Sequence, residues 1–239
     1  MRFHAPLIHG ILIKRYKRFM ADVTLDDGQV VTAHLANSGA MLGTADPGME
    51  VWLSPAANPD RKLKYSWELV RADGVLVGVN TSYPNQIAAE AIAEGKIPEL
   101  TGYQTIRREV KYGASSRIDL LLEAPDRPPC YVEVKNVHLK RGDRAEFPDA
   151  VTVRGAKHLV ELRQMVAQGA RAVMLYLVQR GDCTAFAPAE DIDPAYAAGL
   201  RTAFADGVEA ICYTCHMSLE GISIGEPLPI HLHEGRSFE

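Results

Sequence analysis

Two acidic residues and a lysine share one face of a predicted β-hairpin in the stretch "SRIDLLLEAPDRPPCYVEVKNV", residues 116–137. The Pro- and Asp-rich "APDRPP" is a turn signal, and the runs on either side of it read as antiparallel strands. Side chains alternate between the faces of a strand. The hydrophobic pattern therefore allows one register, which sets Asp119 opposite Glu133, because a slip of one residue would mix the two faces. Lys135 then lies on the same face. The apolar face is predicted to hold Ile118, Leu120, Leu122, Cys130, Val132 and Val134.

Two like charges directly opposite each other destabilise a sheet by about 0.2–1 kcal/mol, so a cation is expected beside Asp119 and Glu133. One interpretation is a local ion-pair cluster in which Arg117 and Lys135 supply the positive charge. The other is a bound divalent metal, since Mg²⁺ takes one or two carboxylates and keeps several waters. The hairpin alone leaves both interpretations open.

A predicted helix follows the hairpin, in "AVTVRGAKHLVELRQMVAQG", residues 150–169, with Asp149 as its expected N-cap. Its apolar face is expected to carry Val153, Ala156, Val160 and Val166. Arg154 and His158 are four residues apart, hence neighbours on the polar side of the helix. We expect them to help hold a phosphate, because a helix N-terminus attracts anions.

The N-terminal third contains a basic and aromatic run, "KRYKRF", on a predicted barrel strand. Small barrels bind single strands through a basic groove with stacking aromatic side chains. The alternative is a charged edge strand whose lysines deter aggregation. We favour the interpretation that this run contacts nucleic acid. A second group of basic and aromatic residues, around residue 63, is expected to contribute more weakly. The predicted nucleic-acid-binding residues are Lys14, Arg15, Tyr16, Lys17, Arg18, Lys62 and Lys64.

The charge distribution also favours a polyanionic partner, although the net charge of the 239-residue chain is −4. Residues 101–180 carry fourteen Lys and Arg against nine Asp and Glu, whereas residues 181–239 carry two against ten. Such local asymmetry is what a phosphate backbone responds to. The four cysteines form no secreted disulfide framework. No signal peptide and no apolar run long enough for a membrane span is evident, so a cytoplasmic protein is expected.

The elements that must position these residues indicate an α+β chain of two domains. Residues 1–80 read as several short strands with close turns, which predicts a five-stranded OB-like barrel. Within them, "GILIKRYKRFMADVTL" reads as one long strand. Residues 81–239 alternate helices and strands, which predicts an α/β sandwich around a mixed sheet.

Asp119, Glu133 and Lys135 match the core of the PD-(D/E)xK nuclease pattern, with "RID" where the pattern has PD. The whole chain further resembles the sugar fermentation stimulation protein A family. That resemblance rests on "GILIKRYKRFMADV", "HLANSGAML", "EVKYGASSRIDLLLE", "CYVEVKNV" and "FPDAVTVRGAKHL", in that order. It implies an OB-like N-terminal domain and a nuclease-like C-terminal domain. Ser38 stands where threonine is expected from the family.

The resemblance implies a bacterial or archaeal DNA-binding protein linked to regulation of sugar metabolism, notably that of maltose. With Asp119 and Glu133 as metal ligands for Mg²⁺ or Mn²⁺, and Lys135, His158 and Arg154 beside them, the alternative is an active nuclease. Its substrate would be DNA or RNA, because backbone contacts and stacking distinguish the two sugars poorly.

Overall fold

The computed structural model describes residues 1–58, 60–113, 116–233 and 236–238. Its N-terminal strands are β1 (Ile8–Tyr16), β2 (Met20–Leu25), β3 (Val30–His34), β4 (Glu50–Pro55), β5 (Tyr65–Ala72) and β6 (Val75–Gly78). Among these strands, β1 and β2 alternate buried with more exposed side chains, whereas β4 and β5 bury several residues in a row.

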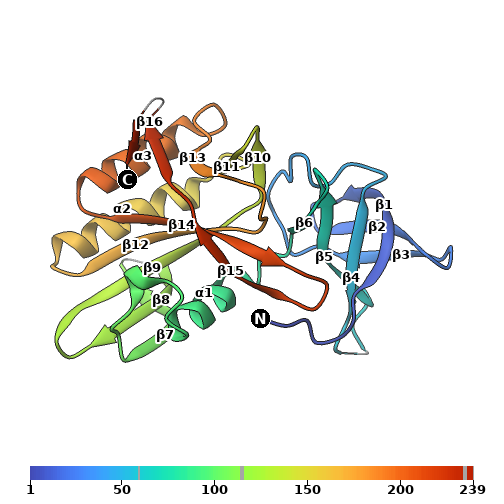
Figure 1. Ribbon diagram of the computed structural model, residues 1–239, viewed down its shortest axis with the longest axis horizontal. Helices are drawn as coiled ribbons and strands as arrows, with labels where there is room; N and C mark the ends of the chain where they lie inside the picture. Colours follow the sequence, from blue (N-terminus) through green and yellow to red (C-terminus); the bar gives the residue numbers. More distant parts are fainter. Residues whose placement is uncertain (59, 114–115, 234–235, 239) are drawn as a thin grey trace.

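These strands close into the expected OB-like barrel. Their order is β3-β2-β1-β4-β5-β6, and a parallel pairing between β3 and β5 closes the first five strands. Trp67, Leu12 and Val23 lie in the barrel core, and Trp67 Nε1 donates to the carbonyl of Leu69 at 2.9 Å. Strand β6 extends the barrel beyond β5 and leads into the second domain (Figure 1).

The basic run does not lie on one long strand, which corrects the sequence-based expectation. Strand β1 ends at Tyr16 and β2 begins at Met20. Lys17 and Arg18 have φ angles of 47° and 65°, so both adopt the left-handed conformation of a tight turn. A propensity pattern cannot reveal this turn, because neither residue is a usual turn former.

The second domain is built on a six-stranded mixed sheet of order β15-β14-β12-β9-β8-β7, as the α/β sandwich required. A five-stranded sheet of order β10-β11-β13-β16-β17 lies beside it. The elements are α1 (Pro84–Ala93), the 3₁₀ turn η1 (Pro98–Leu100), β7 (Thr105–Tyr112), β8 (Ser116–Ala124), β9 (Arg127–Val137), β10 (Leu139–Arg141), β11 (Arg144–Phe147), α2 (Val153–Ala167), β12 (Arg171–Val178), β13 (Ala185–Pro188), α3 (Pro194–Ala205), β14 (Glu209–Met217), β15 (Ile222–Pro227), β16 (Ile230–His233) and β17 (Arg236–Phe238).

Helix α1 covers one face of the large sheet, and α2 and α3 cover the other (Figure 1). Leu120 and Val132 lie on one apolar face, as predicted, and pack in the core that α1 covers. Ile118 was expected beside them but packs with Leu121 in the core under α2 and α3. The side-chain alternation of β8 is therefore broken at Asp119, between these residues.

The face of α2 also differs from its prediction. Val153 and Val160 are 82% and 49% exposed, whereas His158 is 3% exposed. The helix buries Leu159 and Leu162 on the His158 side, so the longer aliphatic side chains, and not the valines, define the packed face. The N-cap is Thr152, whose Oγ1 accepts from the amide of Gly155 at 3.0 Å, and not Asp149.

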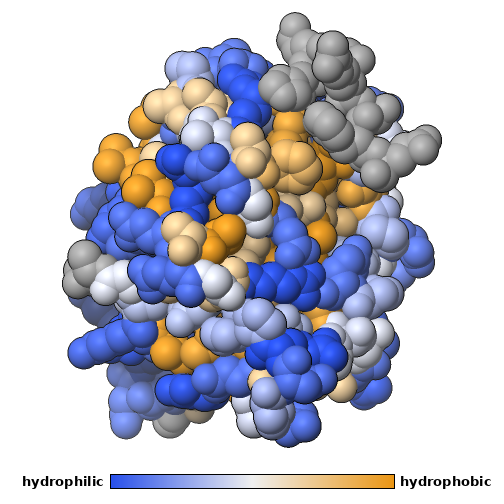
Figure 2. Space-filling view, turned by 90° about the vertical axis from the view of Figure 1, so that its left-hand side faces the viewer, coloured by the Kyte–Doolittle hydropathy of each residue, from blue (hydrophilic) through white to orange (hydrophobic). Residues whose placement is uncertain are grey.

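Direct hydrogen bonds join the two domains. The amide of Gly78 donates to the carbonyl of Gln179 at 2.8 Å, and Arg180 donates to Asp73 at 2.7 Å. The N-terminus lies between the domains, where its ammonium group pairs with Glu90 at 2.6 Å (Figure 1). Among the described residues, no helix is long and apolar enough to cross a membrane. The end of the second domain that faces away from the barrel mixes hydrophilic and hydrophobic surface (Figure 2).

Candidate metal and nucleic-acid site

A polar cavity of about 390 Å³ lies where the barrel meets the second domain. We call it the metal pocket, after the metal site that the sequence predicts at Asp119 and Glu133. The barrel contributes the loop at residues 37–39, and the second domain contributes the starts of α1 and α2, β8, β9 and the segment 147–152. All five predicted catalytic residues, Asp119, Glu133, Lys135, Arg154 and His158, line this one cavity.

Glu133 is 3% exposed, and its two carboxylate oxygens have different surroundings. Oε1 accepts from Lys135 Nζ at 2.7 Å and contacts Nδ1 of His158. Oε2 is buried and has no hydrogen-bond partner among the described residues. Burial alone would raise the pKa of Glu133, but the contacts of His158 and Lys135 lower it below its usual value. Glu133 is therefore ionised at neutral pH and keeps one buried oxygen for a further ligand.

Asp119 faces the same cavity from β8. Its Oδ1 accepts from Asn85 Nδ2 at 2.7 Å, and its Oδ2 accepts from the amide of Val134 at 2.8 Å. The β8–β9 ladder has the expected register at Leu120, paired with Val132, but the described pairing ends there. Asp119 thus bonds the β9 backbone with its side chain. Burial, then the charge of Glu133, raise the pKa of Asp119 to about 6.

His158 lies under Glu133 and not on an exposed helix face. Arg154 Nε donates to His158 Nε2 at 3.3 Å, which makes Nε2 the acceptor. We therefore assign the ring proton to Nδ1, from which it is donated to Glu133. His158 orients Glu133 and Arg154, while Arg154 itself is exposed at the cavity.

The donor set of the metal pocket fits a hard divalent cation held by two carboxylates. Asp119 and Glu133 approach closely enough that the charge of Glu133 shifts the pKa of Asp119. Among the described residues, no group of three or more His, Cys, Asp or Glu side chains is arranged to hold a metal. Mg²⁺ suits such a site, because it takes one or two carboxylates together with waters and substrate phosphates.

The barrel loop in the metal pocket is held by contacts that the sequence did not reveal. Asn37 Nδ2 donates to the carbonyl of Val79 at 2.9 Å, and the amide of Met41 donates to Asp149 Oδ2 at 2.9 Å. A Cβ at Gly39 would lie 2.6 Å from Asp149 Oδ1, so a larger residue there would have to displace the Asp149 carboxylate. No local pattern could indicate this contact, because Met41 and Asp149 are 108 residues apart.

Asp149 therefore joins the two domains across the metal pocket. Its other neighbour is the buried His138, whose Nε2 lies 3.3 Å from Asp149 Oδ2. Burial would raise the pKa of Asp149, but the contacts of His138 and the Met41 amide lower it. The ionised carboxylate fixes the loop that carries Ser38 into the metal pocket.

The predicted nucleic-acid-binding residues fall into separate places. The guanidinium of Arg15 donates to the carbonyls of Asn37, Gly39 and Ala40 at 3.1, 2.9 and 3.2 Å, so it holds the pocket loop.

The other members of the basic run point elsewhere. Lys14 lies 3.6 Å from Asp22, which also accepts from the Tyr16 hydroxyl at 3.0 Å. Lys17 and Arg18 are exposed at the hairpin tip. Lys62 and Lys64 are exposed on the connection between β4 and β5.

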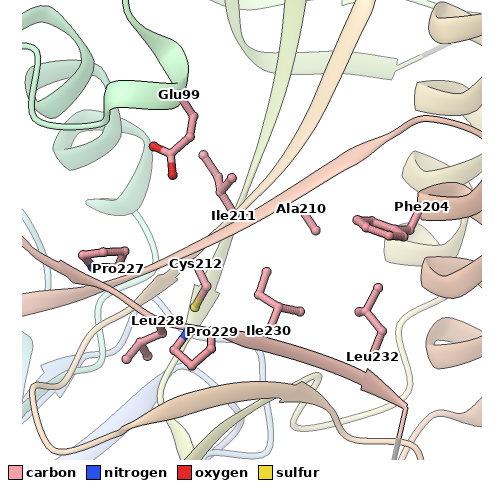
Figure 3. Close-up of a pocket in the computed structure, with 10 residues that line it drawn as sticks. All are labelled: Glu99, Phe204, Ala210, Ile211, Cys212, Pro227, Leu228, Pro229, Ile230 and Leu232. Carbon is pink, nitrogen blue, oxygen red and sulfur yellow. The ribbon is translucent and has the colours of Figure 1, made fainter. Parts of the chain in front are cut away.

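A larger hollow of about 480 Å³ lies between α3, β14 and the segment after β15 (Figure 3). Its wall is mostly apolar, with Phe204, Ile211 and Leu232 from three different elements. Its acidic lining residue among the described residues, Glu99, accepts from the Tyr213 hydroxyl at 2.7 Å. Glu99 is the one carboxylate among the described residues that line this hollow, so the hollow does not compete with the metal pocket as a metal site.

Comparison with known proteins agrees with this two-domain arrangement. The model of the SfsA N-terminal OB domain matches residues 13–79, and that of the sugar fermentation stimulation protein RE domain matches residues 82–221. A sugar fermentation stimulation protein homolog of Paramagnetospirillum magneticum is 70% identical over 98% of this chain and 99% of its own. A homolog of Rhodospirillum centenum is 64% identical over 95% of this chain and 98% of its own.

The solved structure of Pyrococcus furiosus SfsA in complex with Ca²⁺ is similar with a TM-score of 0.88 and 28% identity. The similarity covers 97% of this chain and 98% of that one. The chain belongs to the sugar fermentation stimulation protein family.

Proposed function

We propose that this chain is a DNA-binding protein that holds Mg²⁺ or Mn²⁺ with Asp119 and Glu133 and hydrolyses a phosphodiester bond. The observation that carries the proposal is the asymmetry of Glu133, which has two donors on Oε1 and none on its buried Oε2. A buried carboxylate oxygen without a partner costs free energy unless a ligand satisfies it. We assign the barrel to residues 1–80 and the nuclease-like domain to residues 81–239.

The residues around the carboxylates have separable roles. A bound divalent cation would polarise the scissile phosphate and lower the pKa of a coordinated water. Lys135, held by Glu133, is positioned to orient that water and to stabilise developing negative charge. Arg154 is positioned to hold the phosphate, and His158 keeps both Glu133 and Arg154 in place.

The Pyrococcus furiosus relative was solved in complex with Ca²⁺, and this supports a cation site in the family fold. Ca²⁺ and Mg²⁺ both prefer oxygen ligands but differ in coordination number and rigidity. A site with two carboxylates and open positions suits either ion. Mg²⁺ or Mn²⁺ is the expected ion for hydrolysis.

A second candidate is a DNA-binding regulator of sugar metabolism, notably of maltose, in the cytoplasm, without turnover. It is favoured by the name that the relatives carry, which refers to stimulation of sugar fermentation. In this case the cation and the basic residues would serve phosphate recognition alone. RNA remains an alternative substrate or ligand for both candidates.

One experiment separates these candidates. Labelled single- and double-stranded DNA and RNA are incubated with the protein, with and without Mg²⁺ or Mn²⁺, while calorimetry measures metal binding. Hydrolysis is expected with metal, and Glu133→Gln and Asp119→Asn should abolish it while nucleic-acid binding stays. Lys135→Ala should bind the metal as the wild type does but hydrolyse the substrate much more slowly.

The matched control is Glu123→Gln, which changes a half-buried acid on the same strand as Asp119 whose partner is Arg107, outside the cavity. Metal binding without hydrolysis of any substrate would favour the regulator. Absence of metal binding, with or without DNA, would overturn the metal site itself.

A further inference from the structure

A second polar cavity, of about 340 Å³, lies in the barrel beside the metal pocket. We call it the barrel pocket. It lies where β3 closes against β5, with His34 paired to Ser66, and under the connection between β4 and β5. In OB-type barrels this connection and the neighbouring strands form the usual surface for oligonucleotides.

The wall of the barrel pocket carries a cation with no acidic partner among the described residues. Arg61 Nη1 donates to the hydroxyl of Ser66 at 2.8 Å. Most other arginines of the chain with described contacts pair with carboxylates, as Arg71 does with Glu50 at 2.6 Å. His34 lies beside Arg61, and burial together with the Arg61 charge lowers the pKa of His34. A guanidinium next to a neutral imidazole suits an anion such as a phosphate.

The floor of the barrel pocket is a buried carboxylate that needs no cation. Glu68 is 2% exposed, and it accepts from Ser54 Oγ at 2.5 Å and from Asn80 Nδ2 at 2.7 Å. Burial raises the pKa of Glu68, although these donors act in the opposite direction. Both oxygens thus have protein donors, and their remaining lone pairs suit the N–H donors of an organic ligand.

A thin partition separates the barrel pocket from the metal pocket. Ala36 lines the barrel pocket and the next residue, Asn37, lines the metal pocket. On the facing segment, Thr81 lines the metal pocket and Ser82 lines the barrel pocket. The two segments are joined because the amide and hydroxyl of Thr81 both donate to the carbonyl of Ala36, at 2.9 and 2.6 Å. Consecutive residues are about 3.8 Å apart, so the cavities are near neighbours.

We propose that the barrel pocket binds one unpaired nucleotide of the strand whose adjacent phosphodiester enters the metal pocket. Arg61 contacts the phosphate of that nucleotide, and the base turns into the cavity toward Glu68. The cavity has the size of a site for one small molecule and not for a base pair. The protein therefore selects a strand that is single-stranded next to the bond in the metal pocket. This inference rests on the proposed function for the placement of that bond.

The test measures binding of a fluorescein-labelled 12-nucleotide oligothymidylate and of a 12-base-pair DNA duplex by fluorescence anisotropy in EDTA, where no cleavage occurs. Arg61→Ala is expected to weaken single-strand binding by about tenfold, the scale of one charge-assisted contact. Duplex binding is expected to change by less than about twofold, because the duplex cannot enter the cavity. His34→Ala should show the same selectivity with a smaller loss.

Arg71→Ala is the matched control, because it removes an arginine of the same barrel that already pairs with Glu50. It should change both affinities by less than about twofold. Arg61→Lys keeps the positive charge and replaces Arg61→Ala in the binding test if Arg61→Ala fails to fold. It should retain more single-strand affinity than Arg61→Ala but less than the wild type, because lysine lacks the guanidinium fork.

Equal losses of affinity for the single strand and for the duplex would overturn the subsite. So would a loss of single-strand affinity in Arg61→Ala that is no larger than the loss in Arg71→Ala. Mn²⁺ calorimetry on the same proteins separates this failure from that of the proposed function. Arg61→Ala should bind Mn²⁺ as the wild type does. If the wild type binds no Mn²⁺ but the single-strand loss at Arg61 persists, the nuclease proposal fails while the nucleotide subsite stands.

Discussion

The metal pocket and the barrel pocket each contain a buried glutamate, but the two carboxylates are prepared for different ligands. Glu133 receives both of its donors on Oε1 and leaves Oε2 without a partner among the described residues. Glu68 accepts from Ser54 on Oε1 and from Asn80 on Oε2, and the Tyr83 hydroxyl also bonds to it. The donors also differ, since a lysine and a histidine serve Glu133 while two hydroxyls and an amide serve Glu68. Both glutamates are buried, so burial does not distinguish them. The hydrogen-bond donors around each carboxylate therefore determine whether it suits a cation.

The largest expected effect is on metal binding. Glu133→Gln should weaken Mn²⁺ binding in calorimetry by about 100-fold or more, because loss of even an outer hydrogen-bonding partner costs 10–100-fold. Glu68→Gln should leave Mn²⁺ affinity within about twofold, as expected for sites without shared partners. An equal loss of Mn²⁺ affinity in both variants would mean that the two glutamates do not differ in their suitability for a cation.

The next effect is a difference in pH dependence inside the metal pocket. The pKa of Asp119 is raised to about 6, so the folded state binds a proton more tightly than the unfolded state. The stability that Asp119 contributes is thus present near pH 4 and is lost as the pH rises through 6. The shift corresponds to about 3 kcal/mol at about 1.36 kcal/mol per pH unit, and solvent access to Asp119 reduces this to about 1–2 kcal/mol.

Asp119→Asn should therefore make the metal-free protein more stable to urea at pH 8 by about 1–2 kcal/mol, with no gain near pH 4. Glu133→Gln should do the opposite at pH 8, because the pKa of Glu133 is lowered by its donors. Asp126→Asn, at an exposed turn, is the control. It should leave the free energy of unfolding unchanged at both pH values. If Asp119→Asn gained the same stability to urea at both pH values, the charge of Asp119 would not be the cause of that gain.

Mn²⁺ affinity of the wild type should fall about tenfold per pH unit below pH 6, because a proton then competes for Asp119. Calorimetry at pH 7, 6 and 5 measures this. A constant affinity over that range would indicate that Asp119 does not bind the metal.

A further effect, on stability and on nucleic-acid binding, concerns the loop that the barrel contributes to the metal pocket. Gly39→Ala places a Cβ 2.6 Å from Asp149 Oδ1 and should destabilise the protein by about 1–3 kcal/mol, the range for overpacking. Nucleic-acid binding and cleavage should fall, while Mn²⁺ binding stays, because the described hydrogen bonds of Glu133 are to Lys135 and His158 and not to the loop.

Gly181→Ala is the control, since a Cβ there would meet its nearest neighbouring atom at 3.7 Å. Its stability and binding should match those of the wild type. Loss of Mn²⁺ binding in Gly39→Ala would show that the loop shapes the cation site as well.

The hairpin was predictable because its two faces differ in hydrophobicity over many residues, which left one register for Asp119 and Glu133. The limits of that reasoning appear where the backbone departs from regularity. The alternation breaks at Asp119, and this sent Ile118 to the other core. In α2, apolar residues occur on more than one side, so spacing alone could not decide that Leu159 is buried and Val160 exposed.

Contacts between distant segments were beyond any local pattern. Asp149 was expected to cap α2, but its carboxylate accepts from the amide of Met41, 108 residues away. Arg15 was predicted to contact nucleic acid, which stays a prediction, and the structure adds that its guanidinium holds the carbonyls of Asn37 and Gly39. In both cases the residue type indicated a polar partner correctly, and only the folded chain identifies that partner.

The smallest expected effect separates the two kinds of basic residue within the run at β1 and β2. Lys17 and Arg18 are exposed at the hairpin tip, whereas Arg15 donates to three carbonyls of the pocket loop. If the tip contacts phosphates of a single strand, each contact contributes about 0.7 to the slope of log affinity against log salt. Lys17→Ala with Arg18→Ala should then reduce the slope by about 1.4. Arg15→Ala should instead lower the unfolding temperature and leave the slope nearly unchanged. Anisotropy titrations at several salt concentrations, with thermal unfolding of the same proteins, measure both quantities. A slope reduced by Arg15→Ala but not by the double variant would place the phosphate contact at the pocket loop and remove it from the hairpin tip.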